Sequence, residues 1–275
     1  MEKKLVINAD DFGLSEPITR GILAGFEAGS ITAASALVNL PFTRQALQWA
    51  KGQGYDLGWH FNLTLGRPLS PPEKLTTLVD RNGSFLPLNQ LIQKTVLHRI
   101  RPQEIDLELQ AQWDFFCSYG GKPTHLDGHQ HVHVLPVICE RVRDCIKRFQ
   151  IPFLRIPIEK IAPWRRLPAR TFLFLQKGAR PRFWSGIPVR SLPFFGFSLQ
   201  GEGGLASWES LLKKNRWHEA EVMVHAGYSS RREELSGDDF PGDRQKELQL
   251  LLDPSWKRLL AQSGFRPVSF RELLT

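Results

Sequence analysis

The sequence contains no apolar stretch close to the roughly 18 residues that a membrane-spanning helix needs. Its first residues, MEKKLVINADD, have an apolar core too short for a signal peptide and lack a small-residue cleavage site. Cysteine is scarce, and Cys117, Cys139 and Cys145 form no CxxC pair, which argues against a disulfide framework. These absences predict a cytoplasmic protein without a transmembrane segment.

Motifs for nucleic-acid binding are also missing, since the sequence has no zinc finger, RNA-binding aromatic signature or helix-turn-helix pattern. Lys and Arg nevertheless number 36 against 28 Asp and Glu, which gives a net charge of +8. Such an excess can attract nucleic acid, anionic lipid or a phosphorylated substrate. A solvated basic surface is the simpler explanation, and we expect no nucleic-acid partner.

Short apolar segments that end in polar residues alternate with longer amphipathic segments. The apolar segments are KLVINADD, AASALVNL (33–40), DLGWHFNLT (56–64), PTHLDGHQHVH (123–133), FLRIP (153–157) and AEVMVHAGY (220–228). Each is as short as a buried parallel strand. The first amphipathic segment is EPITRGILAGFEAG; Ser15 directly before it is a helix N-cap, and Pro17 lies just inside the helix. Two further amphipathic segments are PVICERVRDCIKRF and DRQKELQLLLDPSWKRLLAQSG. The alternation predicts an α/β fold with a parallel sheet, a (β/α) barrel first and a doubly wound open sheet second.

We expect a single domain over residues 1–275, because no repeat, low-complexity tract or linker divides the chain. Residues 65–102 are less regular, and GRPLSPPEKL and DRNGSFLP within them are typical of loops and turns. In residues 163–204, aromatic residues and arginines alternate with prolines and glycines. We interpret this stretch as an insertion over one end of the barrel.

Polar residues follow several of the apolar segments, where the predicted strands end, as barrel enzymes arrange their sites. They are Asp10, Asp11, His60, His125, Asp127, His129, Arg155 and His225. Alternate side chains of a strand share a face, so His125, Asp127 and His129 are expected to face the barrel interior. A catalytic zinc-type site takes three protein ligands and leaves one position open for water. Asp11, His60 and His129 offer one carboxylate and two imidazoles, and we predict that they bind one divalent metal ion.

Asp10 and Asp11 are adjacent, and adjacent side chains of a regular strand point in opposite directions. A bulge or bend at the end of the strand would bring both to one site. Asp11 would then bind the metal, while Asp10 takes a proton from the attacking water. Arg155 is the candidate cation that keeps Asp10 ionised. His225 is the candidate acid that protonates the leaving group.

Each of these residues also has a simpler explanation. Adjacent acids at a strand end often form a helix cap or a turn, single histidines such as His60 and His225 often pack or lie on the surface, and Arg155 could pair with a structural acid. HLDGHQHVH is harder to explain by packing, because it holds four histidines in nine residues. Clustered Asp and His favour a metal site, and imidazole ligands alone favour zinc over the harder magnesium.

Five segments together resemble one known family. NADDFGLS, ITAASALVN, GWHFNLTLGRPL, PTHLDGHQHVHVLP and MVHAGY, spread in this order over roughly 1–160 and 220–275, are similar to the YdjC/ChbG-like carbohydrate deacetylases. The resemblance implies a distorted (β/α) barrel of the glycoside hydrolase/deacetylase type. It also implies metal-dependent removal of an acetyl group from an N-acetylated sugar, with acetate as a product. By motif it implies Asp11, His60 and His129 as ligands of a metal that is usually magnesium, Asp10 as the base and His225 as the acid.

The chain departs from the chitooligosaccharide branch of that family, which leaves its substrate open. That branch reads HLDSHHHVH, whereas Gly128 and Gln130 stand here, and the LRIP segment is closer to members associated with hopanoid lipid synthesis. The arginines and aromatic residues of 163–204 would suit a lipid-linked or phosphorylated amino sugar with peripheral lipid contact. The same residues would equally suit a homodimer interface. A non-catalytic sugar-binding barrel is a further alternative, for which no bound metal is expected.

Overall fold

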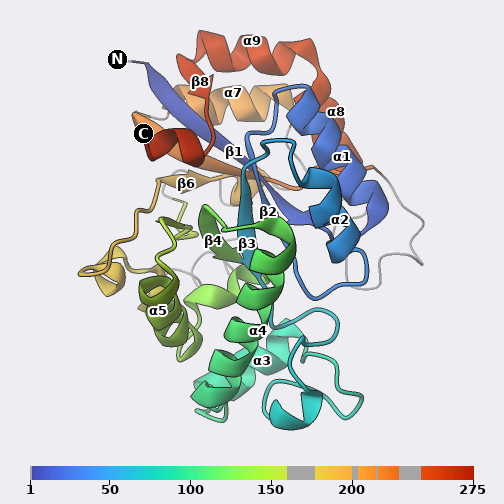
Figure 1. Ribbon diagram of the computed structural model, residues 1–275. Helices are drawn as coiled ribbons and strands as arrows, with labels where there is room; N and C mark the ends of the chain where they lie inside the picture. Colours follow the sequence, from blue (N-terminus) through green and yellow to red (C-terminus); the bar gives the residue numbers. More distant parts are fainter. Residues whose placement is uncertain (1, 160–176, 200–203, 215, 229–242) are drawn as a thin grey trace.

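A curved sheet of eight strands forms the centre of the protein (Figure 1). The structure is a computed structural model, and it describes residues 2–159, 177–199, 204–214, 216–228 and 243–275. The strands are β1 (Lys3–Phe12), β2 (Ala33–Ala36), β3 (Leu57–Phe61), β4 (His125–Gly128), β5 (Phe153–Leu154), β6 (Phe194–Phe195), β7 (Glu219–Val224) and β8 (Phe265–Pro267). They run in the order β5-β4-β3-β2-β1-β7-β6, with β8 paired to β1, and each pairing is parallel. The predicted α/β class with a parallel sheet is therefore confirmed.

The two ends of the sheet are joined by a short contact, which gives the sheet the form of a distorted barrel. Phe153 of β5 forms an isolated parallel bridge with Arg190, which lies shortly before β6. Leu154 N donates to Arg190 O at 2.9 Å, and Arg190 N donates to Pro152 O at 2.8 Å. The distorted (β/α) barrel is thus the architecture of the chain, and the doubly wound open sheet is not.

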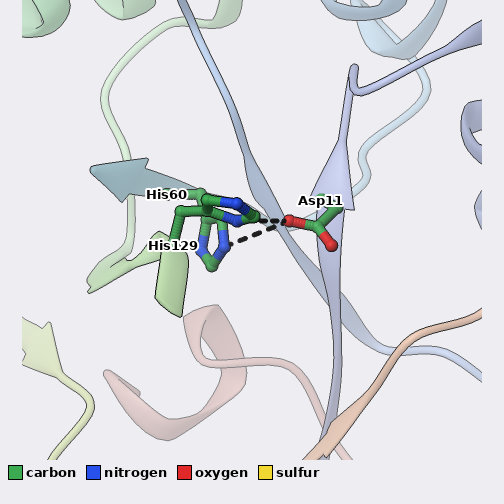
Figure 2. Close-up of side chains that lie close together, drawn as sticks. All are labelled: Asp11, His60 and His129. Atoms are coloured by element: carbon green, nitrogen blue, oxygen red, sulfur yellow. Dashed lines mark hydrogen bonds and ion pairs between the residues drawn. The ribbon is translucent and has the colours of Figure 1, made fainter. Parts of the chain in front are cut away.

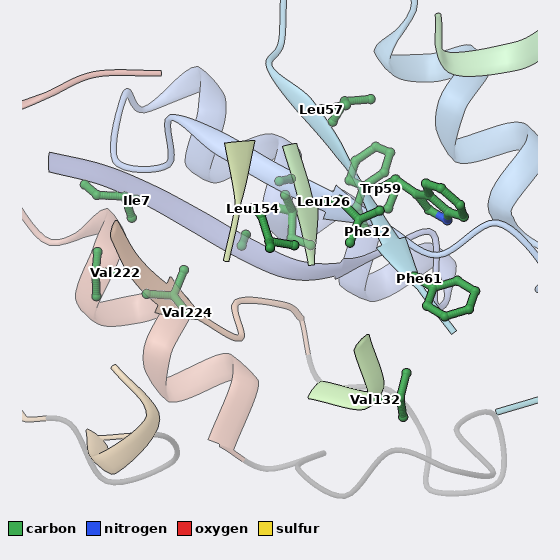
Figure 3. Close-up of a cluster of buried hydrophobic side chains, with 14 of the residues drawn as sticks. Ile7, Phe12, Leu57, Trp59, Phe61, Leu126, Val132, Leu154, Val222 and Val224 are labelled. Carbon is green, nitrogen blue, oxygen red and sulfur yellow. The ribbon is translucent and has the colours of Figure 1, made fainter. Parts of the chain in front are cut away.

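Side chains on both faces of the strands are buried, as expected for parallel strands covered by helices. All five residues of β3 are buried, and in β1 every residue from Leu5 to Phe12 is buried. Apolar side chains from β1, β3, β4, β5 and β7 form one cluster that continues into the surrounding helices (Figure 3). Polar residues inside these strands, such as Asp10 and His60, are therefore held in a closely packed interior.

Helices surround the sheet, with α4 against β3 and α9 against β8 (Figure 1). They are α1 (Glu16–Glu27), α2 (Thr43–Ala50), α3 (Leu88–Val96), α4 (Pro102–Gly120), α5 (Ile138–Phe149), α7 (Leu205–Lys214), α8 (Asp243–Leu252) and α9 (Pro254–Gln262). Ser15 caps α1 as predicted, accepting a hydrogen bond from Ile18 N. The last amphipathic segment forms two helices, because Asp253 ends α8 and caps α9, whose first residue is Pro254.

Two stretches singled out by their composition contribute regular elements. Residues 65–102, which the sequence indicates are less regular, contain helix α3 after the two loop-like segments, and residues 163–204, which we interpret as an insertion, include β6. Part of the latter stretch, 163–176 and 200–203, lies outside the described residues. Within the described ranges, no helix combines the length and apolar character needed to cross a lipid bilayer.

Candidate metal centre

A bulge near the end of β1 turns Asp10 and Asp11 toward one region. The register between β1 and β2 shifts between Ala9 and Phe12, and Asp11 has φ of 69°, in the left-handed region that residues other than glycine rarely adopt. Both carboxylates are buried, each with 2% of the residue exposed. The bulge that the sequence required to bring two adjacent acids to one site is therefore present, and a helix cap or a turn does not explain them.

Asp11, His60 and His129 lie together, as predicted (Figure 2). Asp11 Oδ1 is 3.3 Å from His60 Nε2 and 3.0 Å from His129 Nδ1. Ligand atoms about 2.1 Å from one metal ion are separated by roughly 3.0–3.5 Å in tetrahedral or octahedral geometry. The three side chains come from β1, β3 and the 3₁₀ helix His129–Val134 that follows β4. Their spacing and their donor atoms fit a divalent metal ion.

The second oxygen of Asp11 is held by Arg244 of α8. Arg244 Nη2 donates to Asp11 Oδ2 at 2.6 Å, and both side chains are buried. Burial disfavours the charged carboxylate, but the Arg244 guanidinium, together with His129, outweighs it and holds the pKa of Asp11 well below its usual range. Asp11 is therefore an ionised carboxylate with Oδ1 directed at the two histidines and Oδ2 fixed by Arg244.

A second group of possible ligands, formed by Asp10, His60 and Asp127, already contains a cation. Arg155, which directly follows β5, donates from Nη1 and Nη2 to the two oxygens of Asp10 at 2.6 and 2.7 Å. Arg155 Nη1 also lies 2.8 Å from Asp127 Oδ2. Because the guanidinium occupies both carboxylates, the group of Asp11, His60 and His129 is the better candidate for a metal ion.

Asp127 orients the ring of His60. His60 Nδ1 donates to Asp127 Oδ1 at 2.7 Å, which leaves Nε2 directed at Asp11. Burial alone would lower the pKa of His60, but the carboxylates of Asp127 and Asp10 outweigh it and raise the pKa to about 10. A histidine that donates its other ring N–H to a carboxylate is typical of metal sites. The surroundings of His60 Nε2 are thus negative and favour a cation.

Glu221 of β7 is a third carboxylate on Arg155. Arg155 Nε donates to Glu221 Oε1 at 2.7 Å, and both residues are buried inside the barrel. Burial raises the pKa of Glu221 to about 7, and the nearby Asp127 and Asp10 add to this, although Arg155 acts against it. Arg155 therefore contacts three carboxylates with one positive charge, and Glu221 takes up a proton more readily than Asp127 does.

We expect the Glu221→Gln variant to lose less stability than the wild type between pH 5 and pH 8. A carboxyl group whose folded pKa is raised stabilises the fold below its unfolded pKa, and this contribution disappears as the pH rises through the folded value. The variant has no titrating group at this position and therefore keeps its stability. Between pH 5 and pH 8, the free energy of unfolding of the variant should rise relative to that of the wild type by about 1–3 kcal/mol. Urea unfolding at several pH values measures the difference. A constant difference from pH 5 to pH 8 would contradict the assignment.

His225 directly follows β7 and is buried, with 8% of the residue exposed. Its backbone N donates to Glu247 Oε2 of α8 at 2.6 Å. Burial, followed by the positive charge of Arg244, lowers the pKa of His225 to about 3, so its imidazole is uncharged at neutral pH. His225 is not among the possible metal ligands found in the described part of the chain, and its predicted role as an acid stays a prediction.

The remaining histidines of HLDGHQHVH lie outside the ligand group. His125 is inside the barrel in β4, His131 packs against Phe194 and Phe197, and His133 Nε2 contacts the backbone oxygen of Arg155 at 2.9 Å. A side chain at Gly128 would bring its Cβ within 2.7 Å of His133 Nδ1. Glycine at 128 therefore leaves the space that the His133 ring occupies in this chain.

Three residues of the site carry no sequence signal strong enough to predict their roles. Arg244 lies in an amphipathic helix, where a basic residue is ordinary. Glu221 is an isolated acid in the apolar segment AEVMV, and this alone could have indicated a buried partner of opposite charge. Strand alternation predicts Asp127 inside the barrel, but its contacts with His60 and Arg155 depend on the arrangement of three strands.

A cavity of about 1150 Å³ lies at the carboxyl ends of the strands that carry the site. Its walls include Leu14 after β1, Asn39 after β2, Leu65 and Arg67 after β3, and Tyr228 after β7. Asn62, two residues after His60, donates to Asn39 Oδ1 and Leu65 O, which ties the wall to β3. The cavity is thus built by the loops next to Asp11, His60 and His225.

Comparison with known proteins places the chain in one family. The sequence profile of the YdjC-like protein family matches residues 4–262. A carbohydrate deacetylase of Geobacillus stearothermophilus is 31% identical over 99% of this chain and 98% of its own length. A chitooligosaccharide deacetylase of Yersinia enterocolitica is 31% identical over 99% of this chain and 100% of its own length.

A crystal structure provides the corresponding likeness in fold. It is that of an Enterococcus faecalis protein provisionally described as a cellobiose-phosphate cleavage protein, with a TM-score of 0.79 and 23% identity over 99% of both chains. Family profile, relatives and fold agree over almost the whole length, and the chain belongs to the YdjC-like protein family.

Proposed function

We propose that the chain is a metal-dependent carbohydrate deacetylase, which hydrolyses the acetamide of an N-acetylated sugar and releases acetate. The observation that carries this proposal is the group of Asp11, His60 and His129 at the strand ends, where Asp11 and His60 are buried and the His129 side chain is 12% exposed. The loops that follow these strands line a cavity. The names of the relatives, carbohydrate deacetylase and chitooligosaccharide deacetylase, support the reaction and the substrate class.

Asp11, His60 and His129 would hold one divalent ion. When bound, such an ion lowers the pKa of water and polarises a carbonyl oxygen. Two imidazoles and one carboxylate suit zinc, while the family resemblance implies magnesium. Arg244 holds Oδ2 of Asp11, so this carboxylate offers Oδ1 as its ligand atom.

Asp10 is the proposed base. Arg155 holds both of its oxygens, and Asn8 Nδ2 also donates to Oδ1 at 3.0 Å. This fixes the carboxylate next to the metal ligands and gives it a positive partner, as a base that must stay ionised requires. Asp10 takes a proton from the water that attacks the acetamide carbonyl.

His225 is the proposed acid for the departing amine. Its uncharged imidazole must take up a proton before it can deliver one to the nitrogen, and burial, followed by the positive charge of Arg244, makes the protonated imidazole a strong acid. A low pKa favours transfer of the proton to the leaving amine. Asp10 near the end of β1 and His225 directly after β7 come from neighbouring, paired strands, which supports assigning them to one site.

We expect the purified chain, loaded with zinc or magnesium, to release acetate from N-acetylglucosamine oligomers. Mass spectrometry should show loss of one acetyl unit from the sugar. Asp10→Asn keeps the shape of the side chain but cannot accept the proton, so it should lower kcat by about 100- to 10,000-fold with little change in KM. Glu209→Gln, on the exposed face of α7, is the control and should match the wild type.

Three outcomes separate this proposal from its alternatives. Full activity of Asp10→Asn would contradict the assigned base. Acetate release from a lipid-linked amino sugar, but not from the soluble oligomer, would assign the same chemistry to the glycolipid alternative. Binding of the oligomer without acetate release under any metal would identify a non-catalytic sugar-binding barrel.

A further inference from the structure

A chain of hydrogen bonds leads from the proposed metal centre through the barrel interior. It starts at Asp127, whose Oδ1 binds His60 and whose Oδ2 accepts a hydrogen bond from Ser35 Oγ at 2.7 Å. Ser35 Oγ lies 3.1 Å from His125 Nε2, and the other ring nitrogen of His125 lies 3.0 Å from Thr124 Oγ1. All of these side chains are buried. His125, a buried histidine that the proposed reaction does not use, is therefore linked to the ligand His60.

The far end of this chain is anchored by the C-terminal segment. Thr124 Oγ1 donates to Asp56 Oδ1, and Asp56 Oδ2 accepts a hydrogen bond from Arg271 N at 2.8 Å. Phe270 stacks on the His125 ring with centroids 4.1 Å apart and planes inclined by 29°. The ring is thus clamped from one side by an aromatic residue and from both edges by hydroxyl groups.

The contact between Ser35 and Asp127 depends on which ring nitrogen of His125 carries a proton, while Asn8 Nδ2 also donates to Ser35 Oγ at 2.8 Å. Ser35 and Thr124 each have one hydroxyl proton, and each donates it to a carboxylate, so both present lone pairs to the ring. Burial lowers the pKa of His125 to about 4, and a neutral imidazole has only one N–H. When this proton is on Nε2, Ser35 can keep donating to Asp127. When it is on Nδ1, the single hydroxyl proton of Ser35 can be donated either to His125 Nε2 or to Asp127 Oδ2, but not to both.

We propose that His125 is a positioning residue for the metal centre, because it holds Ser35 against Asp127 and thereby fixes His60 with Nε2 toward Asp11. This inference rests on the proposed function, since it presumes a metal at Asp11, His60 and His129. Partners of metal-ligating histidines typically change metal affinity by 10- to 100-fold. His125 and Ser35 lie one step further out, so an effect of about three- to tenfold is expected.

Cobalt(II) titration of the full chain, followed by visible absorption, tests this directly. We expect Ser35→Ala and His125→Phe each to raise the Kd for cobalt by about three- to tenfold and to alter the cobalt spectrum. His125→Phe keeps an aromatic ring against Phe270 but removes both ring nitrogens. Because the two residues act in series, the double variant should bind cobalt no more weakly than the weaker single variant.

Ser30→Ala is the matched control, since Ser30 is equally buried and its hydroxyl has no hydrogen-bond partner among the described residues. It should leave the Kd unchanged, and thermal unfolding of each variant reports any loss of folding separately. The positioning role would be overturned by an unchanged Kd and spectrum in both single variants. It would also be overturned by an equal rise of the Kd in Ser30→Ala, or by additive rises in the double variant. A wild-type chain that binds no cobalt would instead overturn the proposed metal site.

Discussion

Replacing His60 with alanine is expected to abolish acetate release, with kcat/KM lowered on the order of a thousandfold or more. The variant removes one of three proposed ligands and leaves Asp127 Oδ1 without the ring that binds it at 2.7 Å. A metal contributes several kcal/mol of transition-state stabilisation, and each 1.36 kcal/mol corresponds to a factor of ten in rate. Acetate release measures the expected loss of rate. Plasma mass spectrometry of the purified protein measures the expected loss of bound metal.

His218→Ala is the control for this prediction. His218 is exposed and lies just before β7, so its loss should change neither the metal content nor the rate. A His60→Ala variant that keeps the metal and the full rate would show that the three side chains do not form the centre. In the wild type, a chelator should remove activity, and the metal that best restores it decides between zinc and magnesium.

The sequence was sufficient to predict those parts of the site that depend on strand ends. In a parallel barrel all strands end at the same side, so polar residues after separate apolar segments converge even when they are far apart in sequence. This is why Asp11, His60 and His129 could be grouped, although 118 positions separate Asp11 and His129. The β1 bulge could also be expected, because two adjacent acids reach one site only if the strand is irregular.

The contacts that give the site its charge could not be predicted in this way. Arg244 reaches Asp11 from a helix 233 positions further along the chain, and no periodicity relates the two. The same holds for Ser35, which lies in a segment of small apolar residues and joins Asp127 to His125 only because β2 pairs with β3 and β3 with β4. Such contacts follow from register, which sequence patterns do not specify to a single residue.

Arg155→Met should be strongly destabilising, by about 3–5 kcal/mol at pH 7, because it leaves buried charges uncompensated. The Arg155 side chain is only 1% exposed, and its guanidinium binds Asp10, Asp127 and Glu221. Methionine fills much of the same volume but offers no donor to these carboxylates. Urea unfolding, with the midpoint and slope compared to the wild type, measures the loss.

The pH dependence of this loss distinguishes a charge effect from a packing defect. Arg155 and His60 outweigh the burial of Asp127 and hold its pKa well below the usual range. The stability that this ion pair contributes is present above the unfolded pKa of aspartate, near 3.9, and is lost as the pH falls toward the folded value. The deficit of Arg155→Met should therefore be largest near neutral pH and should shrink on acidification below about pH 4.

Arg190→Met provides the comparison for this prediction. Arg190 also pairs with a carboxylate, Glu219, at 2.8 Å, but its side chain is 47% exposed. Exposed pairs contribute about 0–1 kcal/mol, and the hydrogen bond from Arg190 Nη1 to Leu273 O does not titrate, so the loss of stability in this variant should change little with pH. An Arg155→Met deficit that stays constant down to pH 3 would point to lost packing, since protonated carboxylates no longer need the guanidinium. A deficit that fades with acid would identify Arg155 as the cation around which the barrel's buried carboxylates are arranged.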